Sequence, residues 1–447
     1  MATVAEIRVP TGRRAEIALL AIAVMIAVLA RGLVDYHADF LELDTLGLYA
    51  AGAIVLAGVA HMVVRRYAPS ADTVLLPAVF ALNGIGLAMI RRIDFAYAER
   101  GRETSFGQIQ LGWAVLGLAV MIVVLLVVRD HRVLRRYTYT AGVLGLIGLL
   151  LPLVPGLGTE INGARIWISL FGRSVQPGEF AKIALVIFFA GYLVTNRDTL
   201  ALAGPKFLGM RFPRPRDMGP LVLVWLASML VQIYERDLGT SLLFFGIFLS
   251  MLYVATERLS WVVVGLGMFV AGAAFAGTVF AHVHSRYEAW LHALDPAVYS
   301  SGTSEQLVRG LFGMASGGLL GTGLGEGRPD LVPYAESDFI VASLGEELGL
   351  TGLMAVLTLY VILVQRSMRT AIGVRDGFGK LLAAGLGFSL ALQVFIVVGG
   401  VTRVIPLTGL TTPFLAYGGS SMLANWIIVG LILRVSDQAR RPALEVV

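Results

Sequence analysis

The sequence alternates between long apolar runs and short polar segments along almost its whole length. A helix needs about 20 apolar residues to cross the hydrocarbon core of a bilayer. About twelve runs have this character: 15–34, 45–64, 72–91, 108–128, 138–155, 179–195, 218–234, 238–256, 259–282, 339–365, 380–402 and 413–435. The pattern predicts an all-α polytopic membrane protein with about 12 transmembrane helices and a large extracytoplasmic loop.

The seventh and eighth runs are separated only by the polar segment 234–237. A single helix through this segment would place Glu235, Arg236 and Asp237 in the middle of the membrane, which is energetically costly. The sequence therefore predicts a tight helical hairpin at this point.

Basic residues set the predicted orientation of the helices. With the N-terminus in the cytoplasm, that side collects most of the basic clusters: 13–14, 65–66, 129–136, 197–216, 366–380 and 434–441. Arg91, Arg92, Arg100 and Arg102 run against this bias. The first apolar run lacks a clear small-x-small cleavage site, so we expect a retained anchor and two cytoplasmic termini.

Composition agrees with a membrane protein and excludes several other classes. Hydrophobic residues make up 57% of the chain and charged residues only 15%, whereas soluble domains carry about 25% charged residues. The absence of cysteine excludes disulfides, cysteine-ligated metals and thiol nucleophiles. The net charge of +5 arises from clusters between apolar runs, so we expect no nucleic-acid partner.

Familiar catalytic motifs for soluble enzymes do not occur in the sequence. It contains no P-loop and no H-E-x-x-H metal motif. His282 and His284 can bind a metal in principle, but solvated side chains are the favoured interpretation. No internal repeat is evident, which weakens a secondary-transporter interpretation.

Long connections point to chemistry on the extracytoplasmic side. The predicted outer loops 156–178 and 283–338 and the turn 403–421 are rich in glycine or proline, while the inner connection 196–217 is basic. Long loops in otherwise economical proteins are usually functional or disordered. We therefore expect an active face outside the cytoplasm.

Several polar side chains lie within or beside the apolar runs, where ionisable groups are functional candidates. Glu179 and Lys182 share one helix face at i,i+3 spacing and can neutralise each other, although Glu179 can also stabilise the helix N-terminus. Asp237 can be an N-cap or a site residue. Arg165, close to Trp167, can anchor the membrane boundary or bind a phosphate.

Asp338 stands directly before an apolar helix that contains Glu346 and Glu347. Either Ser337 or Asp338 can cap that helix. Three carboxylates at a membrane entrance also favour raised pKa values, which suit a general base. Both interpretations are open from the residues alone.

The same residues belong to segments that resemble the SEDS family of shape, elongation, division and sporulation proteins, the RodA/FtsW/SpoVE type. The order and spacing of these segments agree with the family pattern from about residue 75 to 436. The matching segments are Gln-Pro-Gly-Glu-Phe-Ala-Lys at 176–182, Asp-Leu-Gly-Thr at 237–240, Arg286 with Trp290, the glycine-rich segment 317–325, Ser-Asp-Phe-Ile at 337–340, Gly-Glu-Glu-Leu-Gly at 345–349, and 406–421. The lack of a long basic tail and the segment 325–330 favour the RodA (elongation) branch.

The resemblance implies a peptidoglycan glycosyltransferase that polymerises lipid II at the outer face of the bacterial cytoplasmic (inner) membrane during cell elongation. Its expected partners are lipid II, polyprenyl-diphosphate-linked glycan, membrane lipids and a class B penicillin-binding protein, a transpeptidase. A divalent cation, Mg or Mn, is a possible cofactor. The alternative functions are a lipid II flippase and a non-catalytic scaffold for a penicillin-binding protein.

The resemblance also assigns residues. Asp338 corresponds to the family's catalytic aspartate and is expected to act as general base, with Glu179 and Lys182 as a functional polar pair. Substrate-binding candidates are the outward arginines Arg165, Arg286 and Arg403, together with Tyr417 and Ser420. No metal ligand is assigned.

The family core has ten helices, which predicts three parts in this chain. Residues 1–68 are expected to form a two-helix N-terminal extension. Residues 69–436 are expected to form the transmembrane core with both outer loops, and 437–447 a short cytoplasmic tail.

Overall fold

The computed structural model describes residues 13–161, 164–170, 172–197, 206–207, 210–211, 223, 225–231, 234–235 and 237–441. Within these residues, ten helices are long and apolar enough to cross a membrane. They are α1 (Arg13–His37), α2 (Leu43–Tyr67), α3 (Leu75–Ala98), α4 (Phe106–Val127), α7 (Pro177–Thr195), α10 (Leu238–Thr256), α11 (Leu259–Val279), α15 (Ile340–Gly373), α16 (Gly377–Val401) and α17 (Gly419–Ala439). The polytopic all-α prediction is confirmed.

Two of the twelve predicted spans differ from this set. The run 138–155 forms the shorter helix α6 (Thr138–Leu150), preceded by α5 (Val133–Arg136) and followed by the 3-10 turn η1 (Leu151–Leu153). Pro152 lies inside that turn, where its ring cannot continue an α-helix. Only residues 223, 225–231 and 234 of the run 218–234, the first half of the predicted hairpin, are described. Most of the connection 196–217 lies outside the described residues; beyond residue 197 only the short strands β4 (Lys206–Phe207) and β5 (Met210–Arg211) are described.

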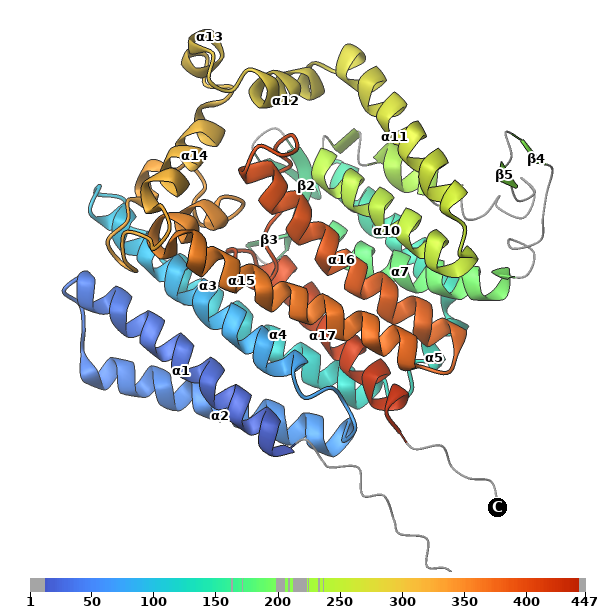
Figure 1. The fold of residues 1–447 in the computed structure, drawn as a ribbon, viewed down its shortest axis with the longest axis horizontal. Helices are drawn as coiled ribbons and strands as arrows, with labels where there is room; N and C mark the ends of the chain where they lie inside the picture. Colours follow the sequence, from blue (N-terminus) through green and yellow to red (C-terminus); the bar gives the residue numbers. More distant parts are fainter. Residues whose placement is uncertain are drawn as a thin grey trace, which may run out of the picture.

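The two outer loops carry secondary structure that the sequence pattern did not predict. Segment 156–178 contains a three-stranded antiparallel sheet in the order β1 (Gly158–Ile161), β2 (Ala164–Leu170) and β3 (Arg173–Val175). The longer loop folds into α12 (Ala281–Leu291), α13 (Pro296–Ser300), α14 (Glu305–Gly317) and the turn η2 (Pro329–Leu331). These elements lie at the end of the bundle where α15 begins (Figure 1), and we call this end the Asp338 face.

The core of the protein is formed by the C-terminal helices together with α3, α7 and α10. Helix α17 is buried along most of its length, and α15 and α16 cross the centre of the bundle beside it (Figure 1). Helices α1 and α2 form a layer against α3 and α4. Gly84 of α3 lies directly against Ala27 of α1, so no larger residue fits at that crossing.

Helix α15 is kinked at Gly349, which has a φ of +66°. A side chain there would overlap the backbone of Gly321, so the position requires glycine. The kink frees backbone groups, and the loop after α14 pairs with them: the Thr322 N–H donates to the Glu346 carbonyl at 3.0 Å and the Gly323 N–H to the Glu347 carbonyl at 3.1 Å. The kink thereby fixes the loop that leads to Asp338.

Candidate active site

Asp338 lies in the turn between η2 and α15 on the Asp338 face. The N-cap of α15 is Phe339, with no capping hydrogen bond from a side chain. Ser337 directs its hydroxyl to the Tyr334 carbonyl at 3.3 Å and to Asp338 Oδ1 at 3.1 Å. The N-cap interpretation of Ser337 and Asp338 is therefore wrong, and the Asp338 carboxylate does not cap the start of α15.

The surroundings of Asp338 favour a carboxylate that can accept a proton near neutral pH. Burial raises the pKa of Asp338 to about 6, with a further increase from Glu336, whereas the Ser337 hydroxyl and Arg286 lower it. A general base works best when its pKa lies near the operating pH. The local environment thus provides the property that the sequence only suggested.

Arg286 links Asp338 electrostatically to Asp237. Burial lowers the pKa of Arg286, and both Asp237 and Asp338 raise it. The guanidinium also donates to the Leu407 carbonyl at 2.7 Å, which holds α12 over the turn that follows α16. Arg286 is therefore a cation that interacts electrostatically with two carboxylates that lie about a hundred residues apart in sequence.

The N-cap interpretation of Asp237 is confirmed. It is the N-cap of α10 and accepts a hydrogen bond from the Thr240 N–H at 2.9 Å. It is also buried, with 8% of its surface exposed. Burial raises the pKa of Asp237, against the Thr240 hydrogen bonds and Arg286, while Glu179 raises it further.

Glu179 and Lys182 form the expected pair on α7. The Lys182 Nζ lies 2.8 Å from Glu179 Oε2. Lys182 is 2% exposed and Glu179 is 6% exposed. Lys182 also donates to Gln393 Oε1 at 2.7 Å, and the Gln393 amide donates to the Thr411 carbonyl at 2.9 Å. This chain of hydrogen bonds connects α7 through α16 to the turn 402–418.

Arg403 is engaged with the protein backbone. Its Nε donates to the Trp290 carbonyl at 2.7 Å and its guanidinium to the Leu291 carbonyl at 2.9 Å. The Trp290 indole donates in return to the Arg403 carbonyl at 3.1 Å. These reciprocal bonds clamp the C-terminal end of α12, which carries Arg286, to the turn after α16.

Tyr417 and Ser420 join separate parts of the site. The Tyr417 N–H donates to the Glu336 carbonyl at 2.7 Å, next to Asp338. The Ser420 hydroxyl accepts from the Gln176 N–H at 2.9 Å, at the start of α7. The first contact holds the turn 402–418 beside the Asp338 loop, and the second holds the start of α17 beside the start of α7. Ser420 is buried, with 6% of its surface exposed.

Arg165 stands apart from this group. It is exposed on β2, beside the half-buried Trp167. Among the described residues the structure assigns it no ion pair. Its guanidinium is therefore available on the Asp338 face, which is compatible with both the anchor and the phosphate interpretations.

Glu346 and Glu347 form hydrogen bonds to the glycine-rich loop, unlike Asp338. Glu347 receives the Arg92 Nε at 3.1 Å and the Gly325 N–H at 2.8 Å, and Glu346 receives the Arg328 N–H at 2.9 Å. Arg92 also donates to the Gly327 carbonyl at 2.7 Å. The two glutamates thus bind the glycine-rich loop to the first turns of α15.

Three residues that sequence reasoning did not select contribute to the site. Gln393 extends the buried pair, Tyr97 donates its hydroxyl to Glu336 Oε2 at 2.8 Å, and Arg92 anchors the loop. Gln393 carried a detectable signal, since it is an isolated amide inside an apolar run. Arg92 also carried a detectable signal, because it is a basic residue on the side of the membrane where the predicted orientation places few basic residues.

The described residues contain no cluster of three potential metal ligands. Within the described part of the chain, no three His, Asp or Glu side chains converge in a way that can hold an ion. Arg286 already supplies positive charge that interacts with Asp237 and Asp338. We therefore derive no catalytic step through a protein-bound metal.

Comparisons with known proteins identify similar chains. The FTSW_RODA_SPOVE family model, described as cell cycle protein, matches residues 73–441. The peptidoglycan glycosyltransferase RodA of Mycobacterium tuberculosis is 50% identical over 436 residues, which cover 97% of this chain and 92% of that protein. Stage V sporulation protein E of Bacillus subtilis is 32% identical over 83% of this chain and 98% of its own.

Solved structures share the fold. The crystal structure of the rod shape determining protein RodA of Thermus thermophilus superimposes with a TM-score of 0.59 at 25% identity, covering 83% of this chain and 98% of that one. A chain from a peptidoglycan synthase complex gives a TM-score of 0.67 at 23% identity, covering 83% and 99%. With a family match over most of its length and a close relative over nearly all of it, the chain belongs to the SEDS family of FtsW, RodA and SpoVE cell cycle proteins.

Proposed function

We propose that this peptidoglycan glycosyltransferase polymerises lipid II with Asp338 as its general base. The observation that carries the proposal is the Asp338 carboxylate, which caps no helix, has a pKa of about 6 and lies near Arg286. The acceptor sugar hydroxyl loses its proton to Asp338 while its oxygen bonds to the anomeric carbon of the donor. The bond from that carbon to the diphosphate breaks, and the lipid diphosphate leaves.

Arg286 is the group best placed to balance negative charge in this step. A fixed cation stabilises the charge that develops on a departing diphosphate. Asp237 caps α10 and interacts electrostatically with Arg286, and its charge favours the charged form of the guanidinium. Arg403 acts as a positioning residue, because its contacts hold the end of α12. Exposed Arg165 is proposed to attract the substrate diphosphate.

A divalent cation, Mg or Mn, is proposed only as part of the substrate. The diphosphate of lipid II carries several negative charges and can bring such an ion with it. This placement agrees with the lack of a three-ligand cluster in the described part of the chain.

The cellular setting is a proposal supported by topology and relationship. We place the chain in the bacterial cytoplasmic membrane with both termini in the cytoplasm and the Asp338 face outside, following the basic clusters. We propose a class B penicillin-binding protein as the crosslinking partner. Half of the residues of this chain are shared with a RodA protein, which supports a role in cell elongation.

Purified protein mixed with lipid II tests the function directly. Formation of glycan polymer, resolved by gel electrophoresis, supports the glycosyltransferase. Translocation of lipid II across proteoliposomes without any polymer would support the flippase instead. Polymer that appears only when a penicillin-binding protein with its own glycosyltransferase is added would support the scaffold.

The pH profile of polymerisation is expected to report Asp338. Its raised pKa of about 6 means that the carboxylate is protonated below that pH and cannot act as base. We therefore expect kcat/KM to rise with pH and to level off above about 6. Ser337→Ala removes a hydrogen bond that lowers the pKa, so the rise should move to higher pH.

The control for this pH measurement is Ser301→Ala, which removes an exposed hydroxyl from the same outer loop. It should leave the midpoint unchanged. A profile that is flat between pH 5 and 7 in the wild type would contradict the assignment of Asp338.

Deletion of residues 1–68 is expected to leave an active core. Every residue proposed for the site lies between Arg92 and Ser420. The deletion removes an even number of helices, so the later loops stay on the same side of the membrane. The measurement is lipid II polymerisation by the purified deletion variant. Complete inactivity in a variant that inserts into membranes and is monodisperse would show that the extension belongs to the catalytic unit.

A further inference from the structure

The turn that carries Asp338 has an unfavourable backbone conformation. Tyr334, at its start, has a φ of +57°, a left-handed value that residues with a side chain seldom adopt. The N–H groups of Ser337 and Phe339 both donate to the Tyr334 carbonyl, at 3.1 and 3.4 Å, so the chain closes tightly around Asp338. Such a conformation persists only where the surrounding structure holds it in place.

Glu336 receives contacts from outside the turn. Its backbone carbonyl accepts the Tyr417 N–H at 2.7 Å, and its Oε2 accepts the Tyr97 hydroxyl at 2.8 Å. The residue is buried, with 9% of its surface exposed. The backbone and the side chain of Glu336 are therefore fixed by two separate elements, the turn 402–418 and α3.

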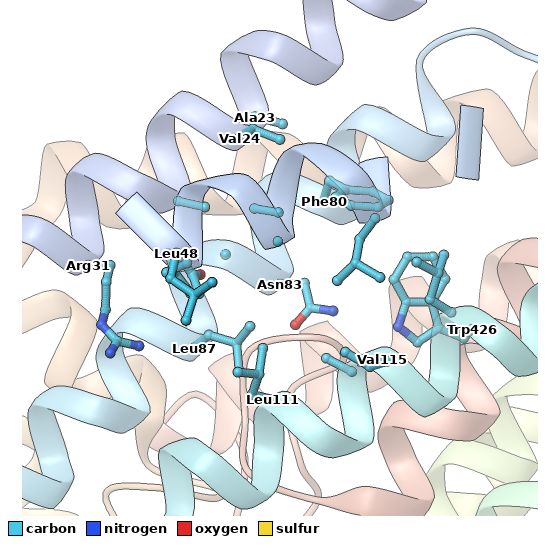
Figure 2. A pocket seen from close by; sticks show the side chains of 18 of the residues that line it. Ala23, Val24, Arg31, Leu48, Phe80, Asn83, Leu87, Leu111, Val115 and Trp426 are labelled. Atoms are coloured by element: carbon cyan, nitrogen blue, oxygen red, sulfur yellow. The ribbon is translucent and has the colours of Figure 1, made fainter. Parts of the chain in front are cut away.

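Helix α3 extends from the membrane interior to the Asp338 loop. In its first half, Phe80 and Asn83 line an apolar cavity of about 420 Å³, which α1 and α2 close from the other side (Figure 2). Nearer the Asp338 face, Arg92 Nε lies 3.1 Å from Glu347 Oε1 on α15. Because α15 begins directly after the Asp338 turn, this contact also fixes the outer end of α3, which carries Tyr97, relative to that turn.

The Tyr97 ring is held by its neighbours. It packs edge-on against Phe106 with 6.4 Å between the ring centroids, and Phe106 packs against Tyr417 at 4.8 Å. The Arg102 guanidinium lies 4.8 Å from the centroid of the Tyr97 ring. The ring therefore has little freedom, and its hydroxyl points in a defined direction toward Glu336.

The carboxylate of Glu336 adds an electrostatic effect to these contacts. Burial raises the pKa of Asp338, and Glu336 raises it further, whereas Ser337 and Arg286 lower it. A glutamine would accept the same hydrogen bond from Tyr97, so that bond does not require a charge. Two carboxylates close together disfavour each other's ionisation. The charge of Glu336 thus acts on Asp338 and has no other evident use in the turn.

Other charged groups nearby have partners of their own. Four of them act electrostatically on the two tyrosines: Arg102, Asp330, Arg173 and Asp94. Asp94 accepts two N–H groups at the start of α4, at 3.0 and 2.7 Å, and Asp330 lies against Arg100 and Arg328. Glu336 is bonded instead to a neutral hydroxyl, which leaves its negative charge uncompensated at that contact.

We propose that Tyr97 and Glu336 form a positioning pair for the general base: the Tyr97 hydroxyl holds the Glu336 side chain in the turn, and the negative charge of Glu336 makes Asp338 a stronger proton acceptor. The inference rests on the proposed role of Asp338. It assigns the control of that residue's basicity to a carboxylate in the turn and a tyrosine from a distant helix.

The first test removes the charge and keeps the hydrogen bond. In purified full-length protein, Glu336→Gln lowers the pKa of Asp338, so the rise of kcat/KM with pH should move to lower pH. We expect a shift of about 0.5–1 unit, less than the 1–3 units typical of a directly adjacent charge. Ser337→Ala should shift the rise in the opposite direction. Glu305→Gln, which removes an exposed carboxylate from the same outer loop, should leave the midpoint unchanged.

The second test removes the hydroxyl and keeps the ring. Tyr97→Phe should lower kcat by about tenfold with little change in KM, because a small misplacement of a catalytic group can cost up to about 10²-fold. The same change made in a Glu336→Ala background should cause no further loss. Tyr299→Phe on α13, in the same outer loop and 40% exposed, is the matched control and should keep full activity.

The outcomes separate this pair from the base itself. An unmoved or raised midpoint in Glu336→Gln would overturn the pair while leaving Asp338 as the base. Losses of Tyr97→Phe and Glu336→Ala that simply multiply would do the same. A flat profile in the wild type would contradict Asp338 as the base, and the pair with it. Thermal unfolding in detergent confirms that each variant is folded.

Discussion

Replacing Asp338 with asparagine is expected to reduce lipid II polymerisation by about 10²–10⁴-fold, which is the usual contribution of a general base. The asparagine has nearly the same size but cannot accept the proton of the attacking hydroxyl. Stability should change little, because Asp338 caps no helix and forms no ion pair within the described residues. The measurement is the initial rate of polymer formation, alongside thermal unfolding in detergent.

Asp295→Asn is the matched control for this experiment. Asp295 belongs to the same outer loop and caps α13 by accepting the Ala297 N–H at 2.9 Å. It should lose at most a small part of the activity. Asp237 is unsuitable as a neutral control, since it shares Arg286 with Asp338. Near-normal polymerisation by Asp338→Asn would remove this loop from consideration as the active site.

The buried pair on α7 is expected to show strong non-additivity. Glu179→Ala or Lys182→Ala alone leaves one charge buried without its partner, which typically costs about 3–5 kcal/mol. The double variant removes both charges and should be less damaging than the sum of the two single changes. A double-mutant cycle on thermal stability and on polymerisation rate measures this coupling.

Lys182 has a second partner in Gln393, so the two single variants should differ. Glu179→Ala leaves the ammonium with Gln393 as an acceptor, whereas Lys182→Ala leaves the Glu179 carboxylate without its Lys182 donor. The exposed pair Glu305–Arg309 on α14 serves as control and should show a coupling of about 1 kcal/mol or less. If the α7 pair behaved like this surface pair, its proposed role in holding α7, α16 and the turn 402–418 together would be wrong.

The apolar runs alone determined that the protein spans a membrane with many helices. Each run buries or exposes its own residues to lipid, so length and composition carry the information locally. The sequence also located the buried pair, because i,i+3 spacing places two side chains on one helix face wherever the helix packs. Asp338 was selected by resemblance and by its position, with an N-cap as the rival interpretation.

Only the tertiary structure decided what each polar residue contacts. Arg286 interacts electrostatically with Asp237 and Asp338 because α12 folds back over the turn after α16, and Lys182 reaches Gln393 across 211 positions of sequence. Glu346 and Glu347, close to Asp338 in sequence, are turned to the glycine-rich loop by the path of α15. The hydropathy pattern reports how far a side chain is buried, but hydrogen-bond partners depend on which helices pack together, and that is set by contacts between distant segments.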